Sequence, residues 1–237
     1  MTDEAPTGVT AHFSVADAAA RIPDTAKLRS IPLFRGAVSH ANTRRLRIEA
    51  LRHEHAAQLF PSLADPRIYA YIPDDPPRSA DALTHRYTLL ERGAPTGSGE
   101  IWLNWAIRLR ISPTYIGTLQ ATVYRRRTAS IAYVLAPPYR GRGYATEGCQ
   151  WLLDYLAFQL RIVAFRATVD TRNEPSWRLL ERLRFQRTGQ QIVEFRGEPV
   201  TDYSYCLRPP PGLTRRTTRT AIGRCPAGPL GAVTFRR

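Results

Sequence analysis

The chain has 237 residues, which is enough for one domain with extensions or for two small domains. It carries 34 Lys and Arg against 20 Asp and Glu. The formal net charge of +14 favours an acidic partner such as a nucleotide, RNA or a ribosomal surface. No run approaches the roughly 18 apolar residues of a membrane span, and no apolar signal segment follows the early acids Asp3 and Glu4.

Three widely spaced cysteines, Cys149, Cys206 and Cys225, match neither a metal-ligand spacing nor a disulfide framework. The five histidines also lack the paired spacing that is typical of a zinc site. We therefore expect reduced cysteines, no metal ion and a cytoplasmic location.

The first elements are separated by clear turn and capping residues. Residues 1–42 show no sustained apolar period, which predicts a flexible N-terminal extension before a domain at 43–208. Pro61 is expected to end one helix, and Ser79 is a good N-cap for another. The elements predicted up to residue 92 are a strand at 44–51, a helix at 54–60, a short element from 65 and a helix at 79–92.

Three strands of an antiparallel meander follow. In the first, every odd position is apolar from Ile101 to Ile111. In the second, Thr118, Gln120 and Thr122 are expected to face outward. The three strands are predicted at 101–111, 115–124 and 129–135, with an arginine triplet in the turn between the last two.

A basic turn after the third strand carries the strongest chemical signal. An apolar strand meets a Pro-Pro break, a turn punctuated by Gly141 and Gly143, and the start of a helix. N–H groups at a helix start lack intrahelical partners, and the helix dipole adds a partial positive charge. The glycines let the backbone approach a phosphate, and Arg140 and Arg142 add charge. The turn is therefore predicted to bind phosphate or pyrophosphate.

The rest of the domain reads as a crossover and a hairpin. Helical periodicity runs from the basic turn to Leu160, and a strand at 163–169 follows, which implies a right-handed crossover with parallel pairing. Asn173 can cap the next helix. The last predicted elements are a helix at 174–183 and hairpin strands at 185–195 and 200–207.

The final segment, residues 209–237, differs sharply in composition. It is rich in Pro, Gly and Arg and contains no acidic residue. We expect a disordered basic tail, which either has no function or contacts RNA.

This order of elements, together with four motifs, resembles the GNAT acetyltransferases and most closely their RimJ/RimL-type branch. The pyrophosphate signature of these proteins is Gln or Arg, two residues, Gly, one residue, and Gly or Ala. It matches Arg140-x-x-Gly143-x-Ala145. The resemblance spans about residues 43–208. The matching stretches are Asp65–Tyr69 with Tyr71–Pro73, Ala132–Pro137, Tyr139–Glu147, and Asn173-x-x-Ser176-x-x-x-Leu180-Glu181.

The resemblance implies an α+β, three-layer GNAT fold. Its mixed central sheet of about seven strands would splay between the fourth and fifth strands, with helices on both faces. Backbone N–H groups freed by the splay would hold the pantetheine arm and polarise the acetyl carbonyl. The implied CoA-binding residues are Val134, Leu135, Ala136, Arg140, Gly141, Arg142, Gly143, Tyr144, Ala145, Thr146, Asn173 and Ser176.

The resemblance also implies roles in proton transfer. RimL-type enzymes use a Glu on the strand after the Asn/Ser helix as general base, and the Ser at the start of that helix protonates the departing thiolate. Carried over by motif, these residues are Glu194 and Ser176. Glu194 is alternatively a solvated strand residue, and Asn173 alternatively a simple N-cap. Glu100 and Glu147 are lesser candidates for the base.

Two positions depart from the family pattern. Ser130 stands where the family often has an acidic residue, and Arg184 stands where the branch usually has the glycine that ends a helix. We predict an acetyl-CoA-dependent N-acetyltransferase that acts on a protein N-terminal α-amino group or a small-molecule amine, by direct transfer in a ternary complex. The alternative is a non-catalytic GNAT-fold protein that binds acyl-CoA or RNA. We also consider contact with the ribosome or RNA and formation of a homodimer, and we expect no contact with a membrane.

Overall fold

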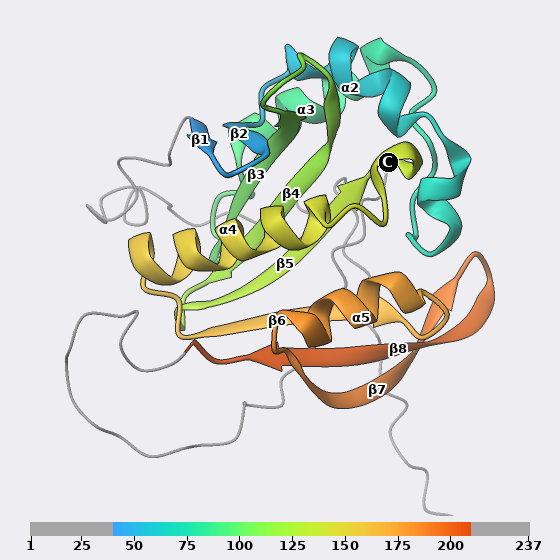
Figure 1. The fold of residues 1–237 in the computed structure, drawn as a ribbon. Coiled ribbons are helices and arrows are strands. Elements are labelled where there is room, and N and C mark those ends of the chain that lie inside the picture. Colours follow the sequence, from blue (N-terminus) through green and yellow to red (C-terminus); the bar gives the residue numbers. More distant parts are fainter. Residues whose placement is uncertain (1–39, 210–237) are drawn as a thin grey trace, which may run out of the picture.

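The computed structural model describes residues 40–209, so most of the predicted extension and the predicted tail beyond Pro209 lie outside the described residues. A mixed sheet runs through the middle, with helices on both of its faces (Figure 1). The strands are β1 His40–Asn42, β2 Leu46–Ala50, β3 Glu100–Leu109, β4 Tyr115–Tyr124, β5 Thr128–Leu135, β6 Ala164–Asp170, β7 Gln186–Phe195 and β8 Glu198–Leu207. The helices are α2 His55–Leu63, α3 Ala80–Arg92, α4 Tyr144–Gln159 and α5 Glu174–Arg182, with short 3-10 helices η3 Pro66–Ala70 and η4 Pro137–Tyr139.

The eight strands form one sheet in the order β1-β2-β3-β4-β5-β6-β8-β7. β5 and β6 pair in parallel, and the other neighbouring strands pair antiparallel. α4 makes the connection between the two parallel strands, as the strand–helix–strand pattern predicts. The predicted α+β fold with a mixed sheet is confirmed.

Three local predictions need correction. Residues 40–42, assigned to the extension, form β1 and pair with β2. Pro61 does not end α2, because burial of Leu59 and Leu63 on one helix face outweighs the hydrogen bond that proline cannot make. Ile111 is not part of β3, which ends at Leu109, and it is 97% exposed.

Each face of the sheet has its own apolar core. α4 and α5 pack on one face, where Leu152, Leu156 and Leu180 are buried. α2 and α3 cover part of the other face, where Leu59 and Leu83 are buried. Thr118 and Thr122 do not face solvent as expected, because both are buried in β4.

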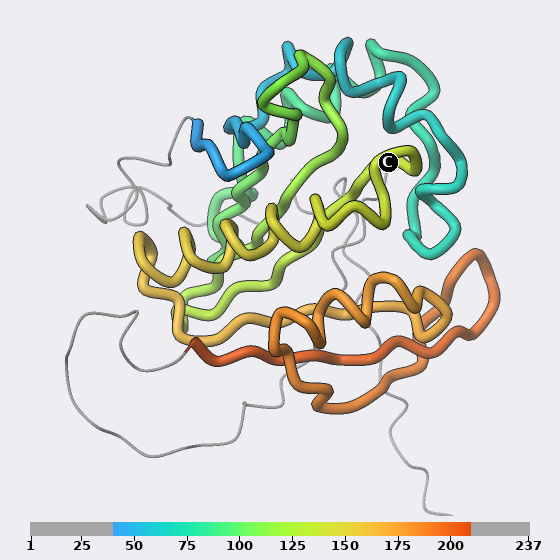
Figure 2. Tube along the Cα trace, viewed as in Figure 1, coloured from blue at the N-terminus to red at the C-terminus, as the bar shows by residue number. Residues whose placement is uncertain are grey.

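β5 and β6 share only a short paired segment. Their register covers Thr128–Ser130 opposite Ala164–Arg166, whereas β5 pairs with β4 along its whole length. Figure 2 shows the two traces starting together and then separating. The predicted splay is confirmed, and it leaves one edge of β5 without a sheet partner from Ile131 onward.

A glycine fixes the outer end of β5 against β4. An ideal Cβ on Gly117 would lie 2.0 Å from the carbonyl oxygen of Val134, so a side chain at this position would clash with the backbone. A substitution at Gly117 would displace the end of β5 that borders the splay. Close backbone approach therefore explains the glycine.

Arg184 follows the end of α5, at the position where a glycine was expected. Arg184 adopts the left-handed conformation with φ of 68°, as a glycine would. Its N–H donates to Glu181 O at 2.9 Å, and Phe185 N–H donates to Leu180 O at 2.9 Å. The helix therefore ends with an arginine in a left-handed conformation, which disfavours a Cβ.

The two described cysteines differ. Cys149 is a free thiol at the centre of α4, and its complete burial raises its pKa. Cys206 is disulfide-bonded, so the expectation of reduced cysteines does not hold for it. None of the helices in residues 40–209 is long and apolar enough to cross a membrane.

Candidate active site

The basic turn forms a cradle of backbone groups at the N-terminus of α4. Gly141 and Gly143 adopt φ of 73° and 78°, a conformation that favours glycine, and Gly143 is the N-cap of the helix. The first bond of α4 runs from Glu147 N–H to Gly143 O at 3.0 Å, so the earlier N–H groups have no partner within the helix. The predicted cradle residues at this turn are Gly141, Arg142, Gly143, Tyr144, Ala145 and Thr146.

A latch from the start of the domain holds this cradle, and the sequence did not reveal it. Glu147 accepts hydrogen bonds from Thr43 Oγ1 at 2.6 Å and from the backbone N–H and Nε of Arg45 at 2.7 Å each. Arg45 Nη1 also donates to Arg142 O at 2.8 Å, and its guanidinium lies 4.6 Å from the ring centroid of Tyr144. The partners are about a hundred residues apart in sequence, so no local motif links them.

The latch also keeps the Glu147 carboxyl ionised. Burial acts to raise the pKa of this carboxyl, but hydrogen bonds from Thr43 and Arg45 outweigh it, and the pKa is lowered. A carboxylate held in this way is a poor proton acceptor. Glu100, the other minor base candidate, accepts a hydrogen bond from Trp102 Nε1 at 2.9 Å.

Further arginines surround the cradle. Arg140 Nε donates to Leu135 O at 3.0 Å, which ties the turn to the end of β5. Arg182 Nη1 lies 3.4 Å from Thr146 Oγ1 in the first turn of α4. With Arg45 and Arg142, these side chains make the neighbourhood strongly positive, which suits a polyanion.

The free edge of β5 presents a subset of the predicted backbone donors. Ala136 N–H donates to Ile116 O at 2.8 Å, so this group is not available to a ligand. Backbone groups alternate in direction along an antiparallel strand, so Val134 also points toward β4. Tyr133 and Leu135 therefore turn their N–H groups into the splay. Of the three predicted residues Val134, Leu135 and Ala136, Leu135 is the one with a free donor.

A pair of hydroxyls spans the splay. Tyr133 Oη on β5 lies 2.9 Å from Ser176 Oγ in the first turn of α5. Burial raises the pKa of Tyr133, which keeps its hydroxyl protonated. Asn173 is the N-cap residue of α5, but its side chain makes no capping hydrogen bond and can serve another partner. The structure thus brings Ser176 and Asn173 to the splay, with Tyr133 as an unforeseen neighbour.

The carboxyl groups near the open end of the splay differ in environment. Glu194 is exposed on β7, the edge strand of the sheet. Asp202 is partly buried on β8, directly opposite Asp170 of β6. Burial and, secondly, the negative charge of Asp170 raise the pKa of Asp202 to about 6. No motif marks Asp202, because its environment comes from a neighbouring strand.

Asp170 keeps its negative charge. Burial acts to raise its pKa, but hydrogen bonds from the backbone N–H and guanidinium of Arg172, the shortest at 2.6 Å, lower it overall. Arg172 lies 5.8 Å and 5.7 Å from the ring centroids of Tyr71 and Phe195. These contacts join the segment after η3 to the β7–β8 hairpin at the open end of the splay.

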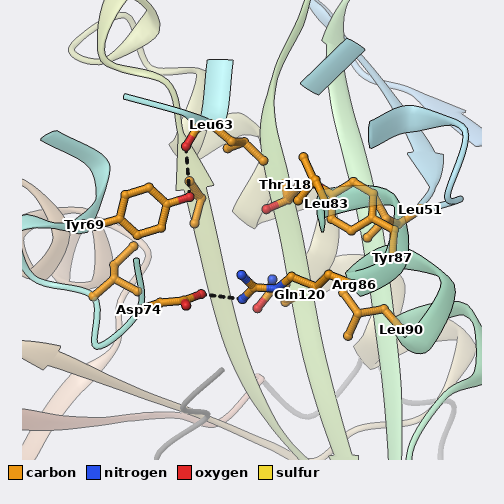
Figure 3. Close-up of a pocket in the computed structure, with 12 residues that line it drawn as sticks. Leu51, Leu63, Tyr69, Asp74, Leu83, Arg86, Tyr87, Leu90, Thr118 and Gln120 are labelled. Atoms are coloured by element: carbon orange, nitrogen blue, oxygen red, sulfur yellow. Dashed lines mark hydrogen bonds and ion pairs between the residues drawn. The ribbon is translucent and has the colours of Figure 1, made fainter. Parts of the chain in front are cut away.

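A small pocket lies on the opposite side of β5 from α4, beneath α2 and α3 (Figure 3). Its walls are mainly aliphatic and aromatic, and an ion pair between Asp74 and Arg86 forms one side. Val134 lines the pocket next to Leu135, so the pocket borders the splay. The lining residues are Leu51, Leu63, Tyr69, Ile72, Asp74, Leu83, Arg86, Tyr87, Leu90, Thr118, Gln120 and Val134.

Comparison with known protein families matches residues 45–186 to the acetyltransferase (GNAT) domain. The chain therefore belongs to the GNAT family and is an acetyltransferase, a family that uses acetyl-CoA. No group of three or more side chains suited to a metal ion occurs within residues 40–209.

Relatives and solved structures are similar at low identity. The uncharacterized N-acetyltransferase YnaD of Bacillus subtilis (strain 168) is 24% identical over 171 residues, which cover 71% of this chain and 96% of the relative. Spermidine N-acetyltransferase from Vibrio cholerae, solved with CoA and spermine, is 20% identical with a TM-score of 0.60, covering 70% of this chain and 96% of that one. The ribosomal-protein-S5-alanine acetyltransferase from Vibrio fischeri is 15% identical with a TM-score of 0.59, covering 71% and 96%. These structural likenesses establish the fold.

Proposed function

We propose that the chain moves an acetyl group from acetyl-CoA to a primary amine by direct transfer in a ternary complex, as a RimJ/RimL-like enzyme. One observation carries this proposal: the free N–H of Leu135 lies at the splay, between an anion cradle and the Tyr133–Ser176 hydroxyl pair. These are the groups that a CoA thioester requires for binding, carbonyl polarisation and departure of the thiolate.

The cradle fits the pyrophosphate of CoA. Unpaired N–H groups from Gly143 to Thr146 would donate to phosphate oxygens, and the helix dipole and nearby arginines would offset the negative charge. An open splay gives the pantetheine arm an unpaired strand edge with which to form hydrogen bonds. The side-chain amide of Asn173 makes no capping hydrogen bond, so it would form a hydrogen bond with the same arm.

Leu135 would stabilise the reacting carbonyl. Its N–H would donate to the thioester oxygen and strengthen that bond as negative charge develops in the tetrahedral transition state. The donor is fixed by the pairing of β5 with β4, and by Arg140 holding Leu135 O at 3.0 Å. Such a fixed donor needs no reorganisation during the reaction.

Asp202 is the proposed general base. Its pKa of about 6 leaves it ionised at neutral pH but able to take a proton, directly or through water, from the ammonium form of the acceptor. Glu194, the base implied by the family resemblance, is the second candidate, and it is exposed on β7. The neutral amine then attacks the thioester carbon.

Ser176 is the proposed general acid. When the carbon–sulfur bond breaks, its hydroxyl would give a proton to the thiolate and recover one from the nitrogen of the intermediate, directly or through water, which leaves a neutral amide. Tyr133 acts here as a positioning residue, because its hydroxyl lies 2.9 Å from Ser176 Oγ and fixes the rotamer of that side chain. The products are the acetylated amine and the thiol of CoA.

The acceptor is a protein N-terminal α-amino group or a small-molecule amine, reached from the α3 side of the sheet. The alternative of a non-catalytic protein that binds acyl-CoA or RNA rests on the basic charge and on the departures at Ser130 and Arg184. The proposal also includes contact with the ribosome or RNA, a homodimer and a cytoplasmic location.

Two measurements test the proposed function. Acetyl-CoA should raise the thermal unfolding midpoint of the protein, because it binds the folded state alone. Release of free CoA thiol should then rise above the no-amine control with at least one member of a panel of N-terminal peptides and small amines, with the acetylated product identified by mass. Stabilisation without amine-dependent thiol release would favour the non-catalytic alternative.

A further inference from the structure

One of the residues that line the pocket beneath α3, Tyr87, has a buried polar group without a partner. The hydroxyl oxygen of Tyr87 is buried and makes no hydrogen bond, and the residue as a whole is only 4% exposed. An unsatisfied buried hydroxyl costs free energy, so such groups are rare in folded proteins unless a ligand or water completes them. Tyr87 lines the pocket that borders the splay at Val134.

A second tyrosine in the pocket has its hydrogen bond already. Tyr69 Oη donates to Leu63 O at 3.0 Å. Burial raises the pKa of both tyrosines, and Tyr69 and Arg86 both influence the pKa of Tyr87, so these groups lie near one another. Both hydroxyls are therefore protonated at neutral pH. Of the two, only the Tyr87 hydroxyl donates no hydrogen bond among the described residues.

The charges in the pocket wall are balanced. Asp74 accepts a hydrogen bond from Arg86, and their side chains are 17% and 29% exposed. The pair contributes no net charge to the pocket, and the remaining walls are mainly apolar. A second ammonium group entering the pocket would lose its hydration without gaining an unpaired carboxylate.

On the basis of the proposed function, we propose that this pocket selects the amine substrate. That substrate is a primary amine attached to a short apolar group, and the group carries one oxygen, of an ether or a hydroxyl, that accepts a hydrogen bond from Tyr87. The reacting amine would lie at the splay and the apolar group would occupy the pocket. The substrate class is therefore a mono-amine with an apolar body, and polyamines are excluded.

The test uses equilibrium binding to the full chain saturated with CoA, so it does not depend on turnover. A series of linear alkylamines is compared by calorimetry with isosteric ethers in which one oxygen replaces one methylene. The affinity of the best ether relative to its matched alkylamine should fall about tenfold in Tyr87→Phe, because the new hydrogen bond is lost. Spermidine should bind more weakly than the alkylamines.

Tyr69→Phe is the matched control, because it removes a buried tyrosine hydroxyl that already has a protein partner. It should lower thermal stability and leave the ether-to-alkylamine ratio unchanged. Tyr87→Phe should retain or gain stability, since it removes an unsatisfied group. An unchanged ratio in Tyr87→Phe, or tighter binding of spermidine than of every alkylamine, overturns the proposal.

Turnover separates this proposal from the proposed function. A binding preference that depends on Tyr87, without thiol release from any amine, supports the pocket and contradicts the transferase reaction. Thiol release that is equally efficient with spermidine and with the best ether supports the reaction and overturns the pocket's selectivity.

Discussion

The two sides of the splay are built in different ways. On the α4 side, the candidate CoA site consists largely of backbone groups and short motifs, such as Gly143 and Leu135, that adjoin one another in the chain. On the α3 side, the pocket and Asp202 are assembled from side chains of distant elements. The first side suits a ligand common to a whole family, whereas the second can change its acceptor by changing a few side chains.

The largest expected effect concerns the base. Asp202→Asn should lower kcat on the order of a hundredfold, which is typical of losing a general base. In the wild type, the rate should fall as pH drops below about 6, because Asp202 becomes protonated. The mutant should lose this dependence in a pH–rate profile.

Glu194→Gln is the matched control for that experiment. It should leave kcat within about twofold, because Glu194 is exposed on the edge strand β7 and the proposed base is Asp202. A large loss in Glu194→Gln with normal activity in Asp202→Asn would reverse the assignment.

Stability measurements distinguish loss of catalysis from loss of folding in the same variant. The folded-state pKa of Asp202 is raised above its usual value of 3.8, so the folded protein gains stability as pH falls through about 6. Asparagine mimics the protonated form. Asp202→Asn should therefore be at least as stable as the wild type at pH 7 in urea unfolding, and this advantage should vanish at a pH below the unfolded-state pKa.

The hydroxyl pair gives the second prediction. Ser176→Ala should lower kcat by about tenfold or more with little change in the affinity for acetyl-CoA, and Tyr133→Phe should have a smaller effect in the same direction. The double variant should resemble Ser176→Ala, because Tyr133 acts through Ser176. Fully additive losses would show that the two hydroxyls act independently, and a loss confined to CoA affinity would reassign Ser176 to binding.

The latch gives the third prediction. Arg45→Met removes a charged hydrogen bond to Arg142 O and the ion pair with Glu147, so the cradle should lose its fixed shape. The Kd for acetyl-CoA should rise by about tenfold, which corresponds to one charge-assisted hydrogen bond. Arg44→Met, one residue earlier, is the control for loss of a positive charge and should have a smaller effect in calorimetry.

The smallest effect is expected at the end of α5, away from both sides of the splay. Arg184→Gly should raise the free energy of unfolding by about 1 kcal/mol, because glycine adopts the left-handed conformation without cost. Arg182→Gly, within the last turn of the helix, should lower it by about 1 kcal/mol. Equal and opposite changes in chemical denaturation would support the geometry, and stabilisation by both would contradict it.

What could be predicted from the sequence follows the same division. The cradle could be predicted from residues close together in the chain, whereas the splay and Ser176 followed from the family resemblance. The latch could not be predicted, because Arg45 and Glu147 meet only after β2 packs beside α4. Asp202 was missed for a related reason: its pKa depends on burial and on Asp170 of another strand, and no spacing encodes either.

Amine-dependent release of CoA thiol, measured together with the mass of the acetylated amine, tests the central claim most directly. The wild type should release thiol in equal amount to the acetylated product, and Ser176→Ala should bind acetyl-CoA normally but turn over slowly. Normal thermal stabilisation by acetyl-CoA, with no acetylated product from any amine of the panel, would contradict the claim.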